Sequence, residues 1–576
     1  MANTSQNYVS NSPRDIAHDI YSIPIQRSDG HGLRNRASSI FSNPIGSFKG
    51  TKSLSRFASS FNRAQSFKNI ETDSFQPRSY FKDEDVLFDR RTLGPSNRGE
   101  RLSKVLPRGE LSSFNYQQRP LLYGDEEGDV DYEAVDDSSY RTPSIYSYGA
   151  IDNHFTDYQE PNTLKVRNIE SKGKILTVIA GQSTSPQTIF NSVNVLIGIG
   201  LLALPLGLKH SGWIIGVPAL TLCALLTYRA AGLLSLCMDT DPTLMTYSDL
   251  AFVAFGPRGR AFISVLFSLD LLASGVALIV LFADSLNAIF PEIPINHFKI
   301  LAFLVLTPPS FLPLNILSFI SLFGIASTIG VVLTILVSGF LKSDSPGSLL
   351  QFMPTNLWPE TIADALIAIG VLMAPFGGHS IFPNLKVDMR HPHKFKDCLQ
   401  VTYLITYATD LSMAIIGFLM FGGAVKEEIT KSVLLTEGYP SWIYIAICGL
   451  TAIVPFSKTP LNARPIISIL DVLFGTDDLS KDKGNWLLVK KVIKISNRLL
   501  VNTAFALIAI VFPEFDKIIA FVGSGLCFLL CLILPSLFYL IICKNSVTSI
   551  EKIECWAVIL VSAILSIVGT AAAVIF

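Results

Sequence analysis

Beyond residue 186 the chain is a succession of long apolar stretches separated by short polar connections. About 20 apolar residues in a helix span the hydrocarbon core of a bilayer, which is roughly 30 Å thick. Lipid offers no partners to backbone N–H and C=O groups, so each spanning segment must satisfy its own backbone. The pattern therefore predicts an all-α membrane protein.

Eleven spanning segments can be drawn, which predicts 11 transmembrane helices. The fourth, eighth and ninth are the hardest to delimit, because prolines interrupt the fourth and the eighth is compatible with a helix that continues past Pro460 and Pro465. The predicted segments are 187–208, 212–236, 261–283, 298–313, 317–341, 361–382, 398–421, 441–457, 499–512, 517–542 and 555–576.

The first 170 residues differ from the rest of the chain. They are polar and serine-rich, they hold 21 of the 46 Lys and Arg residues, and they contain no apolar run of spanning length. A segment that cannot bury enough apolar area stays disordered. We therefore expect two parts: a long disordered N-terminal tail at 1–170 and a transmembrane domain at 171–576.

The tail carries a basic block at 14–108 and an acidic block at 125–137. Serines follow arginines at Arg34, Arg36 and Arg56, and phosphorylation there would add negative charge to a basic segment. Kinases are thus possible partners, and an inert tether is the alternative. The first 25 residues are polar and carry no cleavable signal peptide, so insertion must rely on the first spanning segment.

Lys and Arg residues are distributed unevenly between the alternate connections. One set of connections and their flanks, including the eight Lys and Arg from Lys458 to Arg498, holds 17 of them, whereas the other set holds six. Cytoplasmic connections carry the excess of positive charge. This predicts a cytosolic N-terminus and, with an odd number of spans, a C-terminus on the lumenal side.

Several function classes receive no support. The net charge is zero, so no bulk attraction to nucleic acid is expected. The eight cysteines lie in or beside apolar segments without a zinc-binding CxxC pattern or a disulfide framework. No P-loop, no spaced catalytic triad and no HExxH motif is present. We expect no enzyme, no cofactor, no metal and no ATP-driven pump.

Glycine and proline interrupt the first segment within residues 191–205, NSVNVLIGIGLLALP. Close packing of helices on small residues is one interpretation. However, Asn194 precedes Gly198 and Gly200, and unwinding at these glycines would expose N–H groups at the positive end of a half-helix, which suits a carboxylate. We therefore predict that Asn194, Gly198 and Gly200 bind substrate.

The sixth segment is interrupted in the same way within residues 365–379, ALIAIGVLMAPFGGH. Pro375 removes a backbone donor, and Gly377 and Gly378 permit unusual dihedral angles. Interrupted segments in corresponding positions of two repeats indicate the binding site of a secondary transporter. Gly377 and Gly378 are thus predicted substrate residues, and Phe376 is a gate over the solute or a core residue.

Three ionisable side chains inside predicted segments are candidates for proton coupling: His379, Asp270 and Asp410. Such groups are costly in a membrane and are functional candidates by default. His379 titrates near neutral pH, which suits coupling, although a neutral imidazole that caps freed backbone is the alternative. For Asp270 and Asp410 the alternative is structural hydrogen bonding. Asp284 and Asp364 lie near segment ends, where we expect them to be solvated.

Two motifs carry a specific resemblance. Residues 190–205, FNSVNVLIGIGLLALP, with Gly212 and Trp213, resemble the first-segment motif of the amino acid/auxin permease family. Residues 378–385, GHSIFPNL, with Met389 and Pro392, resemble its sixth-segment motif. The resemblance covers about 390 residues. The long polar tail and the 11 segments are most similar to the fungal vacuolar amino acid transporters of this family.

The resemblance implies a 5+5 inverted-repeat fold of the amino acid–polyamine–organocation type, with segment 11 peripheral. It also implies proton-coupled antiport of neutral amino acids into the vacuole, with the substrate between segments 1 and 6 at the six positions named above. Two alternatives stay open: a symporter that exports amino acids from the vacuole, and a nutrient-sensing receptor that signals through the tail.

Overall fold

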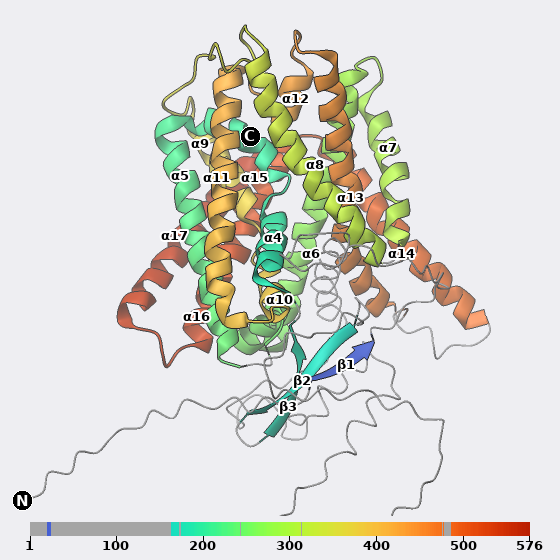
Figure 1. Cartoon of the computed structure of the whole chain (residues 1–576), viewed down its shortest axis with the longest axis vertical. Coiled ribbons are helices and arrows are strands. Elements are labelled where there is room, and N and C mark those ends of the chain that lie inside the picture. The colour runs from blue at the N-terminus through green and yellow to red at the C-terminus, as the bar shows by residue number, and fades with distance from the viewer. Residues whose placement is uncertain are drawn as a thin grey trace, which may run out of the picture. The chain divides into compact units, whose positions relative to one another are not determined.

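The computed structural model describes residues 20–24, 163–171, 174–181, 183–241, 244–312, 314–474, 476 and 485–575, and these fall into two units (Figure 1). Most of the predicted tail, including its arginine-flanked serines and its acidic block, lies outside the described residues. Its disorder stays a prediction.

One unit contains a three-stranded antiparallel sheet in the order β1-β2-β3, which the sequence analysis did not predict. In β2, Leu164 and Val166 alternate with Lys165 and Arg167, the period-two pattern of a strand. Ile20 of β1 pairs with Arg167, and Lys165 pairs with Ala180 of β3. The strands are β1 (Ile20–Pro24), β2 (Thr163–Ser171) and β3 (Lys174–Ala180).

From residue 181 onward the described chain is helical. The α-helices are α4 (Ser185–Leu196), α5 (Gly200–Asp239), α6 (Tyr247–Ile289), α7 (Ile295–Leu306), α8 (Leu314–Leu341), α9 (Ile362–Met373), α10 (Phe382–Val387), α11 (Phe395–Phe421), α12 (Ile429–Leu434), α13 (Ser441–Leu473), α14 (Asn485–Val511), α15 (Phe515–Phe521), α16 (Leu534–Ile542) and α17 (Ser549–Ile575). Short 3₁₀ helices are η2 (Pro308–Phe311), η3 (Ala374–Phe376), η4 (Pro392–Lys394) and η5 (Gly422–Ala424), and η6 (Val522–Ile533) is a π-helix.

Within the described residues, eight helices are long and apolar enough to cross a membrane. This confirms a helical membrane protein. Two of the eight are bent at a glycine in the left-handed region: α5 at Gly212 (φ 66°) and α6 at Gly256 (φ 73°). α5 is two helices joined at that bend, so it covers part of the first and all of the second predicted segment. As expected, α13 continues past Pro460 and Pro465.

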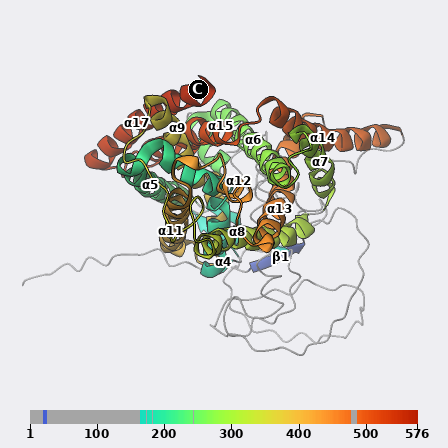
Figure 2. The ribbon, with the colours of Figure 1, turned by 90° about the horizontal axis from the view of Figure 1, so that it is seen from above.

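The helices pack in two groups, which we call the first and the second group. The first comprises α4, α5, α9 and α11, which pack mainly on one another, and the second comprises α6, α7, α8, α13 and α14. Seen from above, α5, α9 and α11 lie on one side and α7, α13 and α14 on the other (Figure 2). The segment from α15 to α16 contacts α5 as well as α6 and therefore lies between the groups.

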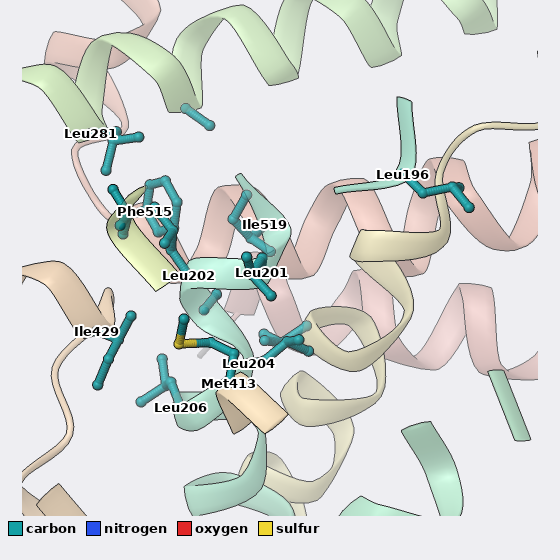
Figure 3. Close-up of a cluster of buried hydrophobic side chains, with 14 of the residues drawn as sticks. Leu196, Leu201, Leu202, Leu204, Leu206, Leu281, Met413, Ile429, Phe515 and Ile519 are labelled. Carbon is teal, nitrogen blue, oxygen red and sulfur yellow. The ribbon is translucent and has the colours of Figure 1, made fainter. Parts of the chain in front are cut away.

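The leucines that follow the first interruption form the centre of the apolar core. Figure 3 shows Leu201, Leu202, Leu204 and Leu206 of α5 among side chains from α6, α11, α12 and α15, and all four are buried. Burial of one such side chain contributes about 1.5–3 kcal/mol. The start of α5 is therefore held firmly, which fixes the position of the backbone just before it.

Candidate functional site

The first segment is broken where the sequence predicted. α4 ends at Leu196, Ile197 takes an extended conformation (φ −72°, ψ 93°), and α5 begins at Gly200. The N–H groups in the first turn of a helix lack acceptors within that helix, so the start of α5 presents a positive dipole end to this gap, where the Leu202 N–H donates to the Ile199 carbonyl at 3.1 Å. This is backbone that can bind a carboxylate.

The sixth segment is broken as well. α9 ends at Met373, the 3₁₀ turn η3 follows, and Gly377 is non-helical (φ −75°, ψ 61°). Regular helix resumes only at Phe382, the first residue of α10. Within the gap, the Gly377 and Gly378 N–H groups donate to the carbonyls of Ala374 and Phe376, at 3.3 and 2.9 Å.

The two breaks lie against each other. A Cβ atom on Gly200 would lie 3.0 Å from the backbone nitrogen of Pro375 and 3.3 Å from the carbonyl carbon of Ala374. A Cβ atom on Gly378 would lie 2.8 Å from Cδ2 of Leu196. Gly200 therefore lets the two interrupted backbones meet, and Gly378 packs against side chains of α4.

Of the other two predicted glycines, only Gly198 has space around it. A Cβ atom on Gly198 would meet only the Leu196 carbonyl oxygen within 4 Å, at 3.8 Å, whereas a Cβ atom on Gly377, which is exposed, would lie 2.8 Å from Sγ of Cys527. Asn194 is half-buried on α4. Phe376 is fully buried and stacks on Tyr403 of α11, with ring centroids 6.5 Å apart and planes 7° apart. The structure thus separates the predicted set into accessible and packing positions.

Buried polar atoms with no hydrogen-bond partner among the described residues border the breaks. They include the hydroxyl of Ser192 on α4 and the whole side-chain amide of Asn384 on α10. On α11, the Thr406 hydroxyl and both carboxyl oxygens of Asp410, one turn further along the same face, share this property. An unpaired buried polar group is costly, so such groups mark places where a ligand, an ion or water can bind.

The three predicted coupling residues occupy different environments. The Nε2 atom of His379 lies 2.8 Å from the carbonyl oxygen of Thr227, so Nε2–H is the donor there. Asp270 of α6 interacts electrostatically with Cys527 of η6, whose Sγ would lie 2.8 Å from a Cβ on Gly377. Asp410 is fully buried on α11. Thr227 lies within α5, away from both breaks in the sequence, and the coupling roles of the three residues stay predictions.

A further residue at the first break was missed. Lys458 Nζ lies 3.0 Å from the carbonyl oxygen of Ile197, the residue at which α4 ends. The sequence analysis counted Lys458 and Arg464 among the cytosolic connections and their flanks, whereas both lie within α13. Arg464 donates to the Leu312 carbonyl at 2.6 Å. Without these two residues, the predicted cytosolic connections and their flanks hold fifteen Lys and Arg residues and the opposite side holds six, so the predicted orientation is unaffected.

A buried ionic cluster lies at α12, outside the breaks. Lys431 donates to Asp284 at 3.0 Å and to Glu427 at 2.8 Å. Asp284 is 2% exposed, so the expectation that it is solvated is wrong. Burial, and then the charge of Asp284, raise the pKa of the fully buried Glu428 well above its usual value. Burial lowers the pKa of Lys431, but Asp284 and Glu427 outweigh it, so the net shift is upward.

On the side of the breaks where α4 begins, polar contacts join the start of the helical unit to the end of α10. Ser183 pairs with Asp388 through side chain and backbone, and the Arg390 N–H donates to the Ser183 carbonyl at 2.9 Å. Lys386 Nζ binds the Ser235 carbonyl at 2.8 Å and Asp239 at 2.5 Å.

Comparison with known proteins identifies a family and relatives. Residues 181–575 match the family described as transmembrane amino acid transporter protein. The chain is 30% identical over 406 residues to amino acid transporter AVT1B of Arabidopsis thaliana, covering 68% of this chain and 71% of that protein. It is 29% identical over 416 residues to AVT1E of the same plant, covering 70% and 75%.

Solved structures of two transporters are similar at low identity. A Na⁺-coupled sialic acid symporter in a substrate-bound outward-open state has a TM-score of 0.44 and 14% identity, over 67% of this chain and 87% of that one. The nucleobase–cation symporter Mhp1, in a closed conformation, has a TM-score of 0.39 and 14% identity, over 68% and 91%.

Proposed function

Since the chain belongs to the transmembrane amino acid transporter family, we propose that it is a secondary active transporter that moves neutral amino acids across the vacuolar membrane. Within this proposal the transporter exchanges amino acids for protons and loads the vacuole by alternating access. The observation that carries it is the contact between two interrupted helices at Gly200 and Pro375. As a member of this family, the chain is a multi-pass membrane transporter and not an enzyme.

The substrate site in this proposal lies between the breaks. The N–H groups at the start of α5 bind the amino acid carboxylate, because the positive dipole end favours an anion there. Gly198 and Gly377 let the solute approach the backbone, Asn194 contributes a polar side chain, and Phe376 covers the site. The preference for neutral amino acids rests on the resemblance to the vacuolar amino acid transporters of the amino acid/auxin permease family.

Eleven membrane-spanning segments and a 5+5 inverted repeat complete the proposed architecture. The bend at Gly212 supports this count, because one 40-residue helix then supplies the second half of segment 1 and all of segment 2. The two breaks lie in segments 1 and 6, the first of each proposed repeat. The charge asymmetry supports a cytosolic N-terminus, and the resemblance to fungal vacuolar transporters supports the organelle.

His379, Asp270 and Asp410 are the coupling candidates taken from the sequence, and Lys458 joins them below. The test of the function is uptake of labelled neutral amino acids into proteoliposomes containing the whole chain, with and without an imposed pH gradient. Accumulation that needs an acidic interior and collapses with a protonophore supports antiport. Uptake that needs an acidic exterior indicates a symporter, and no gradient-dependent flux with any amino acid favours a sensor.

A further inference from the structure

Lys458 lies at the first break, although it belongs to the other group of helices. It is half-buried on α13, and its Nζ donates to the carbonyl oxygen of Ile197 at 3.0 Å. That carbonyl lies where the regular hydrogen bonding of α4 has ended, so the lysine supplies the donor that the interrupted helix lacks. An ionisable side chain within a membrane segment is a functional candidate by default.

The ammonium has no ionic partner in the described part of the chain. Its acceptor is a neutral carbonyl, and neither α4 nor α8 carries a titratable side chain. Lysine changes its protonation state readily when it is buried away from counter-ions. Charged or titratable residues also occur on α13 itself and on the other elements that pack against it: Tyr247, Asp249, Arg258, Arg260, Asp270, Asp284, His297, Lys299, Lys431, Lys490, Lys491, Lys494, Arg498, Tyr444, Cys448, Arg464 and Asp471.

The bond crosses the boundary between the two groups of helices. α13 packs chiefly on α8 and α6 of the second group, whereas Ile197 connects α4 and α5 of the first. His379 differs in this respect, because its partner Thr227 and the second break both pack within the first group. The hydrogen bond of Lys458 therefore links the second group directly to the first break.

We propose that Lys458 is the proton-binding residue that couples the pH gradient to movement of the first group against the second. The proposal rests on the transport function proposed above and identifies the residue that carries the proton. As the ammonium it donates to the Ile197 carbonyl and holds the first break against α13. On release, one N–H bond breaks, the electron pair stays on Nζ and the proton passes to water on the open side. The neutral amine holds the carbonyl more weakly, so protonation changes how strongly the first group is held against the second, while the two groups can move in both forms.

The test compares two transport modes in proteoliposomes. Exchange of labelled for unlabelled amino acid at equal pH needs no net proton movement, whereas accumulation needs coupling. A gradient of one pH unit supports up to about tenfold accumulation at one-to-one stoichiometry, since each tenfold ratio corresponds to about 1.4 kcal/mol. Lys458→Gln removes the titratable group. Lys458→Arg keeps a donor that does not deprotonate. Lys209→Gln is the matched control, because Lys209 is also half-buried and donates to a backbone carbonyl, that of Val425, at 3.3 Å.

We expect both Lys458 variants to exchange amino acid, to equilibrate it without accumulation, and to lose the pH dependence of uptake. Lys209→Gln keeps all three properties. Gradient-driven accumulation at the wild-type level in Lys458→Arg or Lys458→Gln overturns the proposal. Loss of exchange in both variants, when each is purified as monodisperse protein, also overturns the proposal, because that result assigns Lys458 a purely structural role. Failure of the wild-type chain to accumulate any amino acid rejects the proposed function instead, so the two failures are told apart.

Discussion

Gly198 and Gly200 are two residues apart in the first break, yet alanine at each should have opposite effects on stability. At Gly200 the new methyl group would lie 3.0 Å from the Pro375 nitrogen and 3.3 Å from the Ala374 carbonyl carbon. Carbon atoms in good contact lie about 3.5–4.0 Å apart. The obstacle is backbone of η3, which cannot rotate away, so we expect Gly200→Ala to cost about 1–3 kcal/mol, the usual range for overpacking.

At Gly198 the methyl group would meet only the Leu196 carbonyl oxygen within 4 Å, at the ordinary contact distance of 3.8 Å. The backbone there is outside the left-handed region, so alanine restricts the unfolded chain without strain in the folded one. Such a change stabilises a protein by about 0.4–1 kcal/mol. Transport should nevertheless fall, because the space beside Gly198 is where we place the substrate, and Gly198→Val should abolish exchange while the protein stays folded.

The assay measures the apparent melting temperature of each purified variant by size-exclusion chromatography after heating, and exchange in proteoliposomes. We expect Gly200→Ala to melt below the wild type and Gly198→Ala at or above it, with exchange reduced in Gly198→Ala and absent in Gly198→Val. Normal exchange by Gly198→Val would remove Gly198 from the substrate site. Wild-type stability in Gly200→Ala would refute the packing of the two breaks.

Three further substitutions test the charged and polar groups. His379→Ala removes one hydrogen bond, to the Thr227 carbonyl, and should lower stability by about 1 kcal/mol while the pH dependence of uptake is retained; a flattened pH profile would return the coupling role to His379. Asp410→Asn loses no described hydrogen bond and should leave gradient-driven accumulation intact, whereas exchange without accumulation would make Asp410 the proton carrier. Burial raises the pKa of Glu428 from 4.5, so the folded state binds its proton more tightly and stability should decline as pH rises from about 4.5 through the folded-state pKa. Glu428→Gln should flatten that decline in melting curves recorded between about pH 4 and 8, and an unchanged decline would assign the pH response to other groups.

The breaks were predictable because their cause is local. Gly198, Gly200 and Pro375 disfavour a continuous helix wherever they stand, and the apolar stretches around them indicate membrane helices. The different roles of Gly198 and Gly200 could not be predicted, because they depend on which backbone approaches from the sixth segment. That approach depends on tertiary packing, which one sequence without the fold does not supply.

The position of Lys458 at the first break was missed for a related reason. Pro455, Pro460 and Pro465 surround it, and prolines commonly end helices, so the region resembled a connection rich in positive charge. In the fold, α13 carries all three prolines because neighbouring helices can satisfy the freed backbone groups of a membrane helix. The strands β1 and β2 were missed because they are short segments within a long polar region, where composition favours disorder.

The proposed substrate site and the proposed proton site share one short piece of backbone. The carbonyl of Ile197 is bound by Lys458, and the first N–H groups of α5, three residues later, are directed at the substrate. A shift that releases that carbonyl must also move those donors, since the leucines that follow are fixed in the core. Coupling between two ligands is reciprocal. If proton binding changes the affinity for the amino acid by some factor, amino acid binding must change the affinity for the proton by the same factor. The amino acid dissociation constant should therefore depend on pH in the wild type and become independent of pH in Lys458→Arg. If the pH dependence of binding survives in that variant, the two sites are coupled through a different residue.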